Sequence, residues 1–295
     1  MLKLRQLNAI TFTSMNSICI CGAGTMGSGI AQVAARAGFR TVLYDVNEKM
    51  IGSAREKMEK DLQALVEKQK ILEQQKKETL GNILFTSKVE DCVADVIIEA
   101  IIEKLDAKTS LFDKLAELNS ADTLFATNTS SLSVSGIARE VKFPERVAGL
   151  HFFNPAPVMK LVEVVKADQT SNSTITKLVK LTNRMGKTAV VCKDSPGFIV
   201  NRVARPYYIE SLRLVEDGLA DFETIDRLLE SKGFRMGPFK LMDLIGNDVN
   251  YAVSCSVYEQ LNGPERLRPS DIQKQKVETG ELGKKTGKGY YDYKK

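Results

Sequence analysis

Long apolar runs are missing from this sequence of 295 residues. No stretch approaches the roughly 20 apolar residues that a membrane-spanning helix needs, so we expect a protein that does not cross a membrane. Hydrophobic residues make up 43% and charged residues 27% of the chain, which is typical of a soluble globular protein. The length suits two domains, since single cores rarely grow beyond about 250 residues.

A broad basic surface is also missing, although the formal net charge is +5. Residues 284–295 alone carry five lysines against one aspartate, and the rest of the chain is nearly neutral. Because no wide basic face is interleaved with aromatic residues, we expect no nucleic acid partner. The basic C-terminal segment is either a solvated terminus or a place that holds a phosphate group.

Patterns that bind metals or form disulfides are scarce. The five cysteines are an odd number without C-x-x-C spacing, and the one histidine, His151, has no cysteine near it in the sequence. Cys19 and Cys21 are two residues apart in a predicted strand and share one face, which indicates packing. We expect neither a disulfide framework nor a metal site, and we expect a reducing, cytoplasmic compartment.

The first 14 residues, MLKLRQLNAITFTS, contain two basic and no acidic side chains, and so weakly resemble a transit segment. The stretch is short and lacks a long apolar core, and Met15 lies two residues before the first predicted strand. We expect a disordered extension or an upstream start codon.

Short apolar, β-branched runs recur through the first two thirds of the chain, and helix-length segments separate most of them. These runs are residues 17–21, 41–44, 83–86, 94–100, 123–127, 147–153, 161–165 and 188–192. The alternation predicts an α/β fold, with a Rossmann-type doubly wound sheet over residues 16–197. Between the second and third runs, residues 47–80 have the composition of a solvated helical hairpin.

Strand character stops after the sequence DSPGF at 194–198. Three helices are predicted beyond it, at 198–218, 221–233 and 237–261, the last with Pro238 in its first turn. The second domain, 198–295, is therefore expected to be all helical.

Three glycines, Gly22, Gly24 and Gly27, follow the first predicted strand and precede a helix. Alone, this G-x-G-x-x-G pattern also fits an ordinary tight turn. Asp45, however, ends the second strand 18 residues after Gly27, where its carboxylate can bind the adenosine ribose hydroxyls. Strand, glycines, helix, strand and acid together predict a dinucleotide site, and an acid at that place favours NAD over NADP.

His151 lies in the sequence HFFNPAPVMKLVEV, at the end of a predicted strand, where ligands bind in such sheets. Alone, a single histidine is more often structural. If the strands at 147–153 and 161–165 form a hairpin that pairs Phe152 with Val162, His151 faces Glu163. A carboxylate on one ring nitrogen orients the imidazole, as a general base requires.

Six motifs in order resemble the 3-hydroxyacyl-CoA dehydrogenases, over a region from about residue 16 to the C-terminus. They are GAGTMGSGIAQ, ATNTSSLS, GLHFFNPAPVMKLVEV, PGFIVNR, MGPFKLMDLIG and GKKTGKGYYDY. The compact length and the motif around His151 most resemble the bacterial 3-hydroxybutyryl-CoA dehydrogenases. The resemblance implies an NAD-dependent enzyme, an acyl-CoA substrate and a homodimer formed through the helical domain.

The resemblance also implies roles for individual residues. His151 becomes the general base and Glu163 its partner, while Ser130 and Asn201 hold the substrate oxygen. The implied NAD contacts are Gly22, Ala23, Gly24, Thr25, Met26, Gly27, Asp45, Glu103, Lys108, Ser130, Asn154 and Lys285. Lys68, and Ser130 again, are the implied contacts to the coenzyme A substrate.

Several of these assignments have a simpler alternative. Lys68, Lys108 and Lys285 taken alone would be solvated lysines, and Ser130 or Asn201 alone could be helix caps. Asp61 stands where some members have a serine that touches coenzyme A, so the sequence departs from the family at the nucleotide end of that site.

The sequence thus predicts reversible, NAD-dependent oxidation of the 3-hydroxyl of a 3-hydroxyacyl-CoA. Two other functions stay open: a dehydrogenase of a free hydroxy acid, and a non-catalytic NAD-binding structural protein on the same fold.

Overall fold

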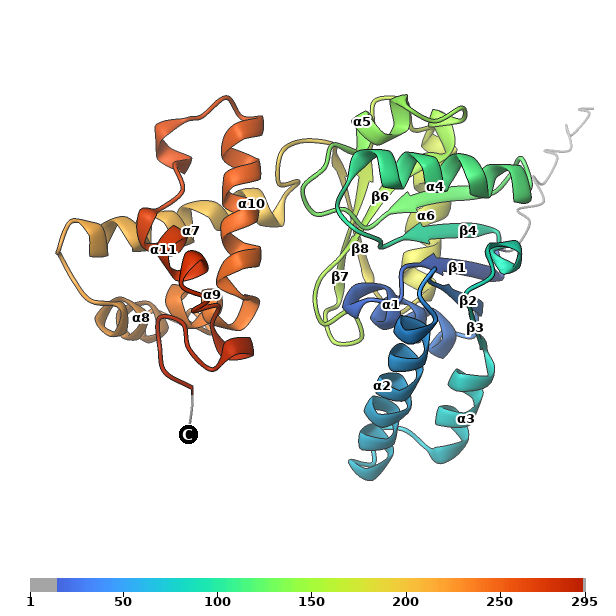
Figure 1. Cartoon of the computed structure of the whole chain (residues 1–295), viewed down its shortest axis with the longest axis horizontal. Helices are drawn as coiled ribbons and strands as arrows, with labels where there is room; N and C mark the ends of the chain where they lie inside the picture. Colours follow the sequence, from blue (N-terminus) through green and yellow to red (C-terminus); the bar gives the residue numbers. More distant parts are fainter. Residues whose placement is uncertain (1–14, 294–295) are drawn as a thin grey trace, which may run out of the picture. The chain divides into compact units, whose positions relative to one another are not determined.

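The computed structural model describes residues 15–293, so the expectations for residues 1–14 lie outside the described residues. The chain forms two compact units (Figure 1). The first unit takes the chain up to Asn128, together with Ala138–Val164 and Gln169–Val190. The second unit takes Thr129–Ile137, Val165–Asp168 and the chain from Val191 onward. The domain boundary that we place after residue 197 stays a prediction.

An eight-stranded sheet is built in the order β3-β2-β1-β4-β5-β6-β7-β8. Its strands are β1 (Ser17–Cys21), β2 (Arg40–Tyr44), β3 (Ile83–Thr86), β4 (Val96–Glu99), β5 (Leu124–Thr127), β6 (Val147–Phe152), β7 (Leu161–Lys166) and β8 (Thr188–Lys193). The pairs from β3 across to β6 are all parallel. Each strand overlaps a run that the sequence predicts, and the doubly wound α/β fold is confirmed.

Helices of the first unit lie between most of its strands. They are α1 (Thr25–Arg36), α2 (Glu48–Glu67), α3 (Glu73–Gly81), α4 (Leu105–Leu118) and α6 (Asn172–Arg184), with the 3-10 turns η1 (Val89–Asp91) and η2 (Pro144–Arg146). The short α5 (Val134–Arg139) lies where the chain passes between the two units. α2 and α3 form the predicted helical hairpin, and they project from the sheet in Figure 1.

The core of the first unit lies between the sheet and its helices. Ile18 and Ile20 of β1 are fully buried in one apolar cluster with Ile30 of α1 and Leu62 of α2. Cys19 and Cys21, which alternate with these isoleucines, are also fully buried. β1 is therefore covered on both faces, as expected for a central parallel strand.

The second unit consists mainly of helices. They are α7 (Val200–Glu216), α8 (Phe222–Ser231), α9 (Pro238–Ile245), α10 (Asn247–Gln260) and α11 (Asp271–Glu278), with the 3-10 turns η3 (Glu265–Leu267) and η4 (Lys284–Thr286). Phe222, Phe239 and Tyr290 pack edge-to-face or tilted, with ring centroids 4.7 to 5.0 Å apart. These aromatic contacts fix the C-terminal segment against α8 and α9.

The single helix predicted over 237–261 is wrong. Two helices, α9 and α10, occupy this range, and Gly246 separates them with φ at +104°. That dihedral lies outside the helical region and favours glycine, so the chain turns there rather than continuing.

Among residues 15–293, no helix has both the length and the apolar composition that crossing a bilayer demands.

Candidate active site

The turn between β1 and α1 brings three glycines together for different reasons. Gly22 has a φ of +106°, and a Cβ atom there would clash with the backbone of Ala100. A Cβ atom at Gly27 would clash with the carbonyl oxygen of Gly22, so this glycine lets the helix pack onto the turn. Gly24, by contrast, faces open space, with no atom within 4 Å of an added Cβ. The turn therefore leaves room beside Gly24 for the backbone to approach a ligand.

Helix α1 begins at this turn without a side-chain cap. Gly24 is its N-cap residue, and Thr25 and Met26 open its first turn. Uncapped N–H groups at a helix N-terminus attract anionic groups such as a pyrophosphate. These features fit a dinucleotide phosphate.

Asp45 lies directly beside the glycine turn, where the sequence predicts it. Its carboxylate accepts hydrogen bonds from the backbone N–H of Ala23 at 2.8 Å and of Asn47 at 2.9 Å. Asp45 follows β2, which pairs with β1 so that Tyr44 lies opposite Cys21. Strand register thus places a half-buried carboxylate beside the glycine turn.

His151 and Glu163 are in contact, as the proposed hairpin predicts. His151 lies in β6 and Glu163 in the neighbouring β7, and His151 Nδ1 is 2.8 Å from a carboxylate oxygen of Glu163. The two side chains are only 7% and 1% exposed. Because a carboxylate can only accept, Nδ1 carries the proton of the neutral ring, and Nε2 keeps its lone pair.

Two neighbours hold the segment around His151. The ring of Phe153 packs at 4.5 Å between centroids against the imidazole. The side-chain oxygen of Asn128 accepts a hydrogen bond from the backbone N–H of Phe152 at 2.9 Å. The backbone N–H of Asn128 donates to the backbone carbonyl oxygen of Glu99 at 2.8 Å. Asn128 thus ties the ends of β4 and β6 together, a role that the sequence analysis missed. Its position directly after β5 was the available signal.

Lys108 is not the solvated lysine that it would be if taken alone. Its ammonium lies 2.6 Å from Glu99 and 3.0 Å from Glu103, and its side chain is 1% exposed. Glu99 also accepts from Thr127 Oγ1 at 2.7 Å and from Ile101 N at 2.8 Å. Burial raises the pKa of Glu99, although the Lys108 ammonium and these hydrogen bonds oppose that shift. Glu103 and Lys108 are predicted from the sequence, whereas Glu99, the centre of this network, is not.

A cavity of about 290 Å³ lies between α1, α2 and the segment 154–158. Asn154 and Asp61 both line it, and so does Lys57, which pairs with Asp61 at 2.9 Å. This ion pair is exposed, with 64% and 51% of its side chains accessible, so it contributes little stability. Lys68, at the C-terminal end of α2, is exposed.

Lys187 holds the far side of the same segment. Its ammonium donates to the carbonyl oxygens of Ala156 at 2.5 Å and of Met159 at 2.7 Å. Partial burial lowers the pKa of Lys187. The sequence predicts no role for this lysine, because its partners lie about 30 residues away along the chain.

Three of the predicted site residues, Ser130, Asn201 and Lys285, belong to the second unit. Asn201 lies in the first turn of α7, and its carbonyl oxygen accepts from Arg205 Nε at 3.0 Å. Lys285 pairs with Asp248 at 2.6 Å. That these three residues meet the coenzyme or the substrate stays a prediction.

Comparison with family models matches both parts of the chain. Residues 17–195 match the model described as 3-hydroxyacyl-CoA dehydrogenase, NAD binding domain. Residues 197–293 match the model described as 3-hydroxyacyl-CoA dehydrogenase, C-terminal domain.

Relatives of the chain carry names from the same family. It is 46% identical over 283 residues to a 3-hydroxyadipyl-CoA dehydrogenase of Escherichia coli (strain K12), which covers 95% of this chain but 60% of that protein. It is 41% identical over 281 residues to a probable 3-hydroxybutyryl-CoA dehydrogenase of Bacillus subtilis (strain 168), covering 95% of this chain and 98% of that one. The chain therefore spans about three fifths of the first relative and nearly all of the second.

Solved structures agree with these matches. A crystal structure of (S)-3-hydroxybutyryl-CoA dehydrogenase from Ralstonia eutropha superposes with a TM-score of 0.91 at 34% identity. The match covers 96% of this chain and 100% of that one.

Proposed function

The chain belongs to the 3-hydroxyacyl-CoA dehydrogenase family, and we propose that it oxidises the 3-hydroxyl of a 3-hydroxyacyl-CoA to the ketone, reversibly, with NAD. The observation that carries the proposal is the buried contact between His151 and Glu163 at the end of β6. A protein that only binds NAD does not need a buried, oriented imidazole in its NAD binding domain.

His151 acts as the general base in this proposal. Glu163 accepts from Nδ1–H, so the lone pair of Nε2 is available to take the proton of the 3-hydroxyl. As the proton moves to Nε2, the imidazolium forms beside the Glu163 carboxylate, which stabilises the new positive charge. In the reverse direction the same Nε2–H donates a proton to the ketone oxygen.

NAD, when bound, supplies the acceptor for the hydride that leaves C3. We assign its binding to the glycine turn from Gly22 to Gly27 and to Asp45, with the Glu103–Lys108 pair and Asn154 as further contacts. The open space at Gly24 and the carboxylate beside Ala23 N support this assignment. Ser130, Asn201 and Lys285 are retained as proposed contacts because of the family motifs that contain them.

Asp45 makes a prediction about coenzyme choice. Its carboxylate would repel the 2′-phosphate of NADP and would lose its hydrogen bonds to the ribose. We expect the specificity constant for NAD to exceed that for NADP clearly. Asp45→Ala should reduce the ratio of the two specificity constants by about tenfold, which corresponds to the free energy of one charged hydrogen bond. A wild-type preference for NADP would contradict the role of Asp45.

The cavity beside α2 is the proposed entry for the acyl-CoA. It is bounded by the segment that contains Asn154 and by the helix that carries Lys68 near its end. Because Lys57 pairs with Asp61, the lysine offsets part of the charge that an anionic substrate would meet there.

Assays of NADH oxidation test the substrate class. The substrates are 3-ketoacyl-CoAs of graded length, 3-ketoadipyl-CoA and the corresponding free 3-keto acids. We expect turnover of CoA thioesters, with 3-ketobutyryl-CoA among the good substrates. Turnover of the free acids alone would favour the hydroxy-acid alternative, and no turnover with any substrate would favour a structural role.

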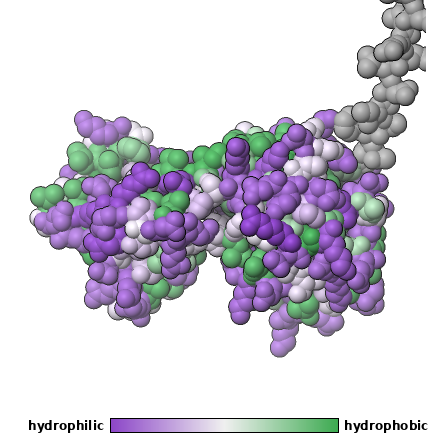
Figure 2. All heavy atoms as spheres, turned by 90° about the horizontal axis from the view of Figure 1, so that it is seen from above, coloured by the Kyte–Doolittle hydropathy of each residue, from purple (hydrophilic) through white to green (hydrophobic). Residues whose placement is uncertain are grey.

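We further propose that the protein works in a reducing compartment, the cytoplasm. We also propose that it forms a homodimer. The second unit exposes large apolar side chains, among them Val203 at 71%, Leu228 at 58% and Phe234 at 50%. In Figure 2 hydrophobic residues lie among hydrophilic ones on the visible face of the unit at the left. Exposed apolar residues favour association, and light scattering at several protein concentrations measures the mass.

A further inference from the structure

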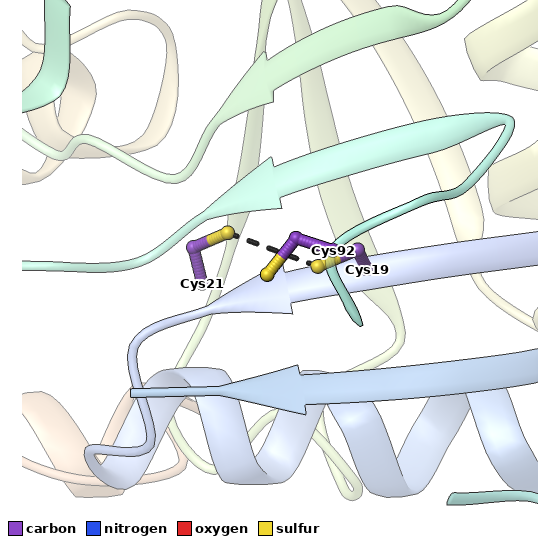
Figure 3. A group of neighbouring side chains, drawn as sticks. All are labelled: Cys19, Cys21 and Cys92. Carbon is purple, nitrogen blue, oxygen red and sulfur yellow. Dashed lines mark hydrogen bonds between the residues drawn. The ribbon is translucent and has the colours of Figure 1, made fainter. Parts of the chain in front are cut away.

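Three cysteine sulfurs meet inside the first unit, two of them on the strand that leads into the glycine turn. Cys19 and Cys21 come from β1, and Cys92 comes from the segment between η1 and β4 (Figure 3). All three residues are fully buried. Their sulfur atoms all lie within 4.8 Å of one another, and those of Cys19 and Cys21 are 3.9 Å apart.

The backbone holds this cluster in place. Cys19 and Cys21 are two residues apart on a strand, so their side chains point to the same face of the sheet. Hydrogen bonds to both its backbone N–H and its carbonyl oxygen hold Cys92 in place. Its N–H donates to Val89 O at 3.0 Å, and its carbonyl oxygen accepts from Asn119 Nδ2 at 2.7 Å. The sulfurs are therefore positioned by the fold.

The spacing of the sulfurs matches a three-coordinate metal site. Zn–S bonds are about 2.3 Å long, and three sulfurs at that distance in a trigonal plane lie about 4.0 Å from one another. Within the described part of the chain, the group of potential ligands consists of these three thiols. Zinc prefers four ligands in a closed structural site, whereas soft d10 ions such as Cd(II) accept three thiolates.

We propose that Cys19, Cys21 and Cys92 form a three-thiolate site for a soft, divalent, thiophilic cation of the cadmium and mercury class. Each thiol that becomes a ligand releases its proton, so a divalent ion with three thiolates carries one negative charge. A monovalent ion would leave two negative charges, which burial penalises more strongly. Packing explains the burial of the three residues, but it does not require their sulfurs to converge.

Entry to the site is available through the segment that carries Cys92. Val93, the next residue, is 58% exposed, and Glu90 is exposed as well. A local opening of this short surface segment would uncover the sulfurs without disturbing β1.

Cd²⁺ is the probe, because it is redox-silent and its bonds to thiolates absorb in the ultraviolet. Cys192 and Cys255, the two other cysteines, are partly exposed and are replaced first in the double variant Cys192→Ala/Cys255→Ala. This protein keeps only the three clustered thiols. We expect it to bind one Cd²⁺ per chain, with thiolate-to-cadmium absorption, proton release and affinity equal to that of the wild type.

Adding Cys92→Ala to the double variant should weaken Cd²⁺ binding by roughly a hundredfold and remove most of the charge-transfer absorption, since one of three ligands is lost. Unchanged absorption in this variant would overturn the proposal. If the variant fails to fold, the double variant still decides: absence of one-to-one binding there overturns the site. Zn²⁺ is titrated in parallel, and binding of Zn²⁺ more tightly than Cd²⁺ would contradict the three-coordinate assignment.

Discussion

Among residues 15–293, each unit buries two carboxylates almost completely, but their partners differ. In the first unit Glu99 is bonded to Lys108, and Glu163 is bonded to His151. Both partners are ionisable side chains, and Glu99 and His151 lie at or next to the carboxyl ends of the parallel strands β4 and β6. In such sheets, ligands bind at that edge.

The two buried carboxylates of the second unit are satisfied mainly by neutral donors. Asp226 accepts from the backbone N–H of Phe239 and Lys240 at the start of α9, and from Tyr291. Asp243 accepts from Asn247 and from three sites in the C-terminal segment, namely Tyr290 N, Tyr291 N and Tyr293 Oη. Such bonds fix the chain without exchanging a proton. We propose that partner type, rather than burial, separates a carboxylate that assists catalysis from a structural one.

Replacing His151 should have the largest effect. His151→Gln keeps a side chain that can donate to Glu163 but removes the base, and loss of a general base typically costs on the order of a hundred- to ten-thousand-fold in rate. We expect kcat to fall within that range, while NAD affinity, measured by calorimetry, stays unchanged. Retention of more than a tenth of the wild-type kcat would make His151 a structural residue.

Glu163→Gln should come next, at about a hundredfold in kcat, because the amide keeps the shape but cannot stabilise the imidazolium. KM should change little, since the residue lies behind the histidine. Circular dichroism controls for folding. A kcat equal to that of the wild type would place Glu163 with the structural carboxylates.

Asp243→Asn tests the other side of the comparison. In this variant the amide NH₂ faces N–H and O–H groups that donate hydrogen bonds to the wild-type carboxylate. We therefore expect the free energy of unfolding to fall by about 2 kcal/mol. Urea unfolding measures this loss, and Asp217→Asn, on an exposed side chain, is the matched control. The kcat of the folded variant should equal that of the wild type, and a large fall in kcat at full folding would break the distinction between the two units.

Local sequence patterns predict part of the fold and part of the candidate site. The strands, the glycine turn and the place of Asp45 follow from periodicity and spacing, because a parallel sheet puts successive strand ends at one edge. The contact of His151 with Glu163 follows from alternation in two strands joined by a short loop. These features depend on neighbours in the sequence or on one strand register.

Other features depend on contacts that the sequence does not encode locally. Lys108 is buried because Glu99, at the end of β4, meets it across a turn. Cys92 reaches Cys19 over more than 70 residues of sequence, through the pairing of β1 with β4. Gly246 divides a helix that composition alone makes continuous, since only the dihedral angle reveals the turn.

The nitrogen NMR spectrum of His151 tests the central claim most directly. The chain has one histidine, so its ring signals need no assignment. With Glu163 accepting from Nδ1, the neutral ring must carry its proton on Nδ1, and Nε2 must be the unprotonated nitrogen that acts as base. We predict this tautomer in the wild type at a pH where the ring is neutral. A ring with its proton on Nε2 would contradict the account, because the nitrogen assigned as the base would then have no lone pair to offer.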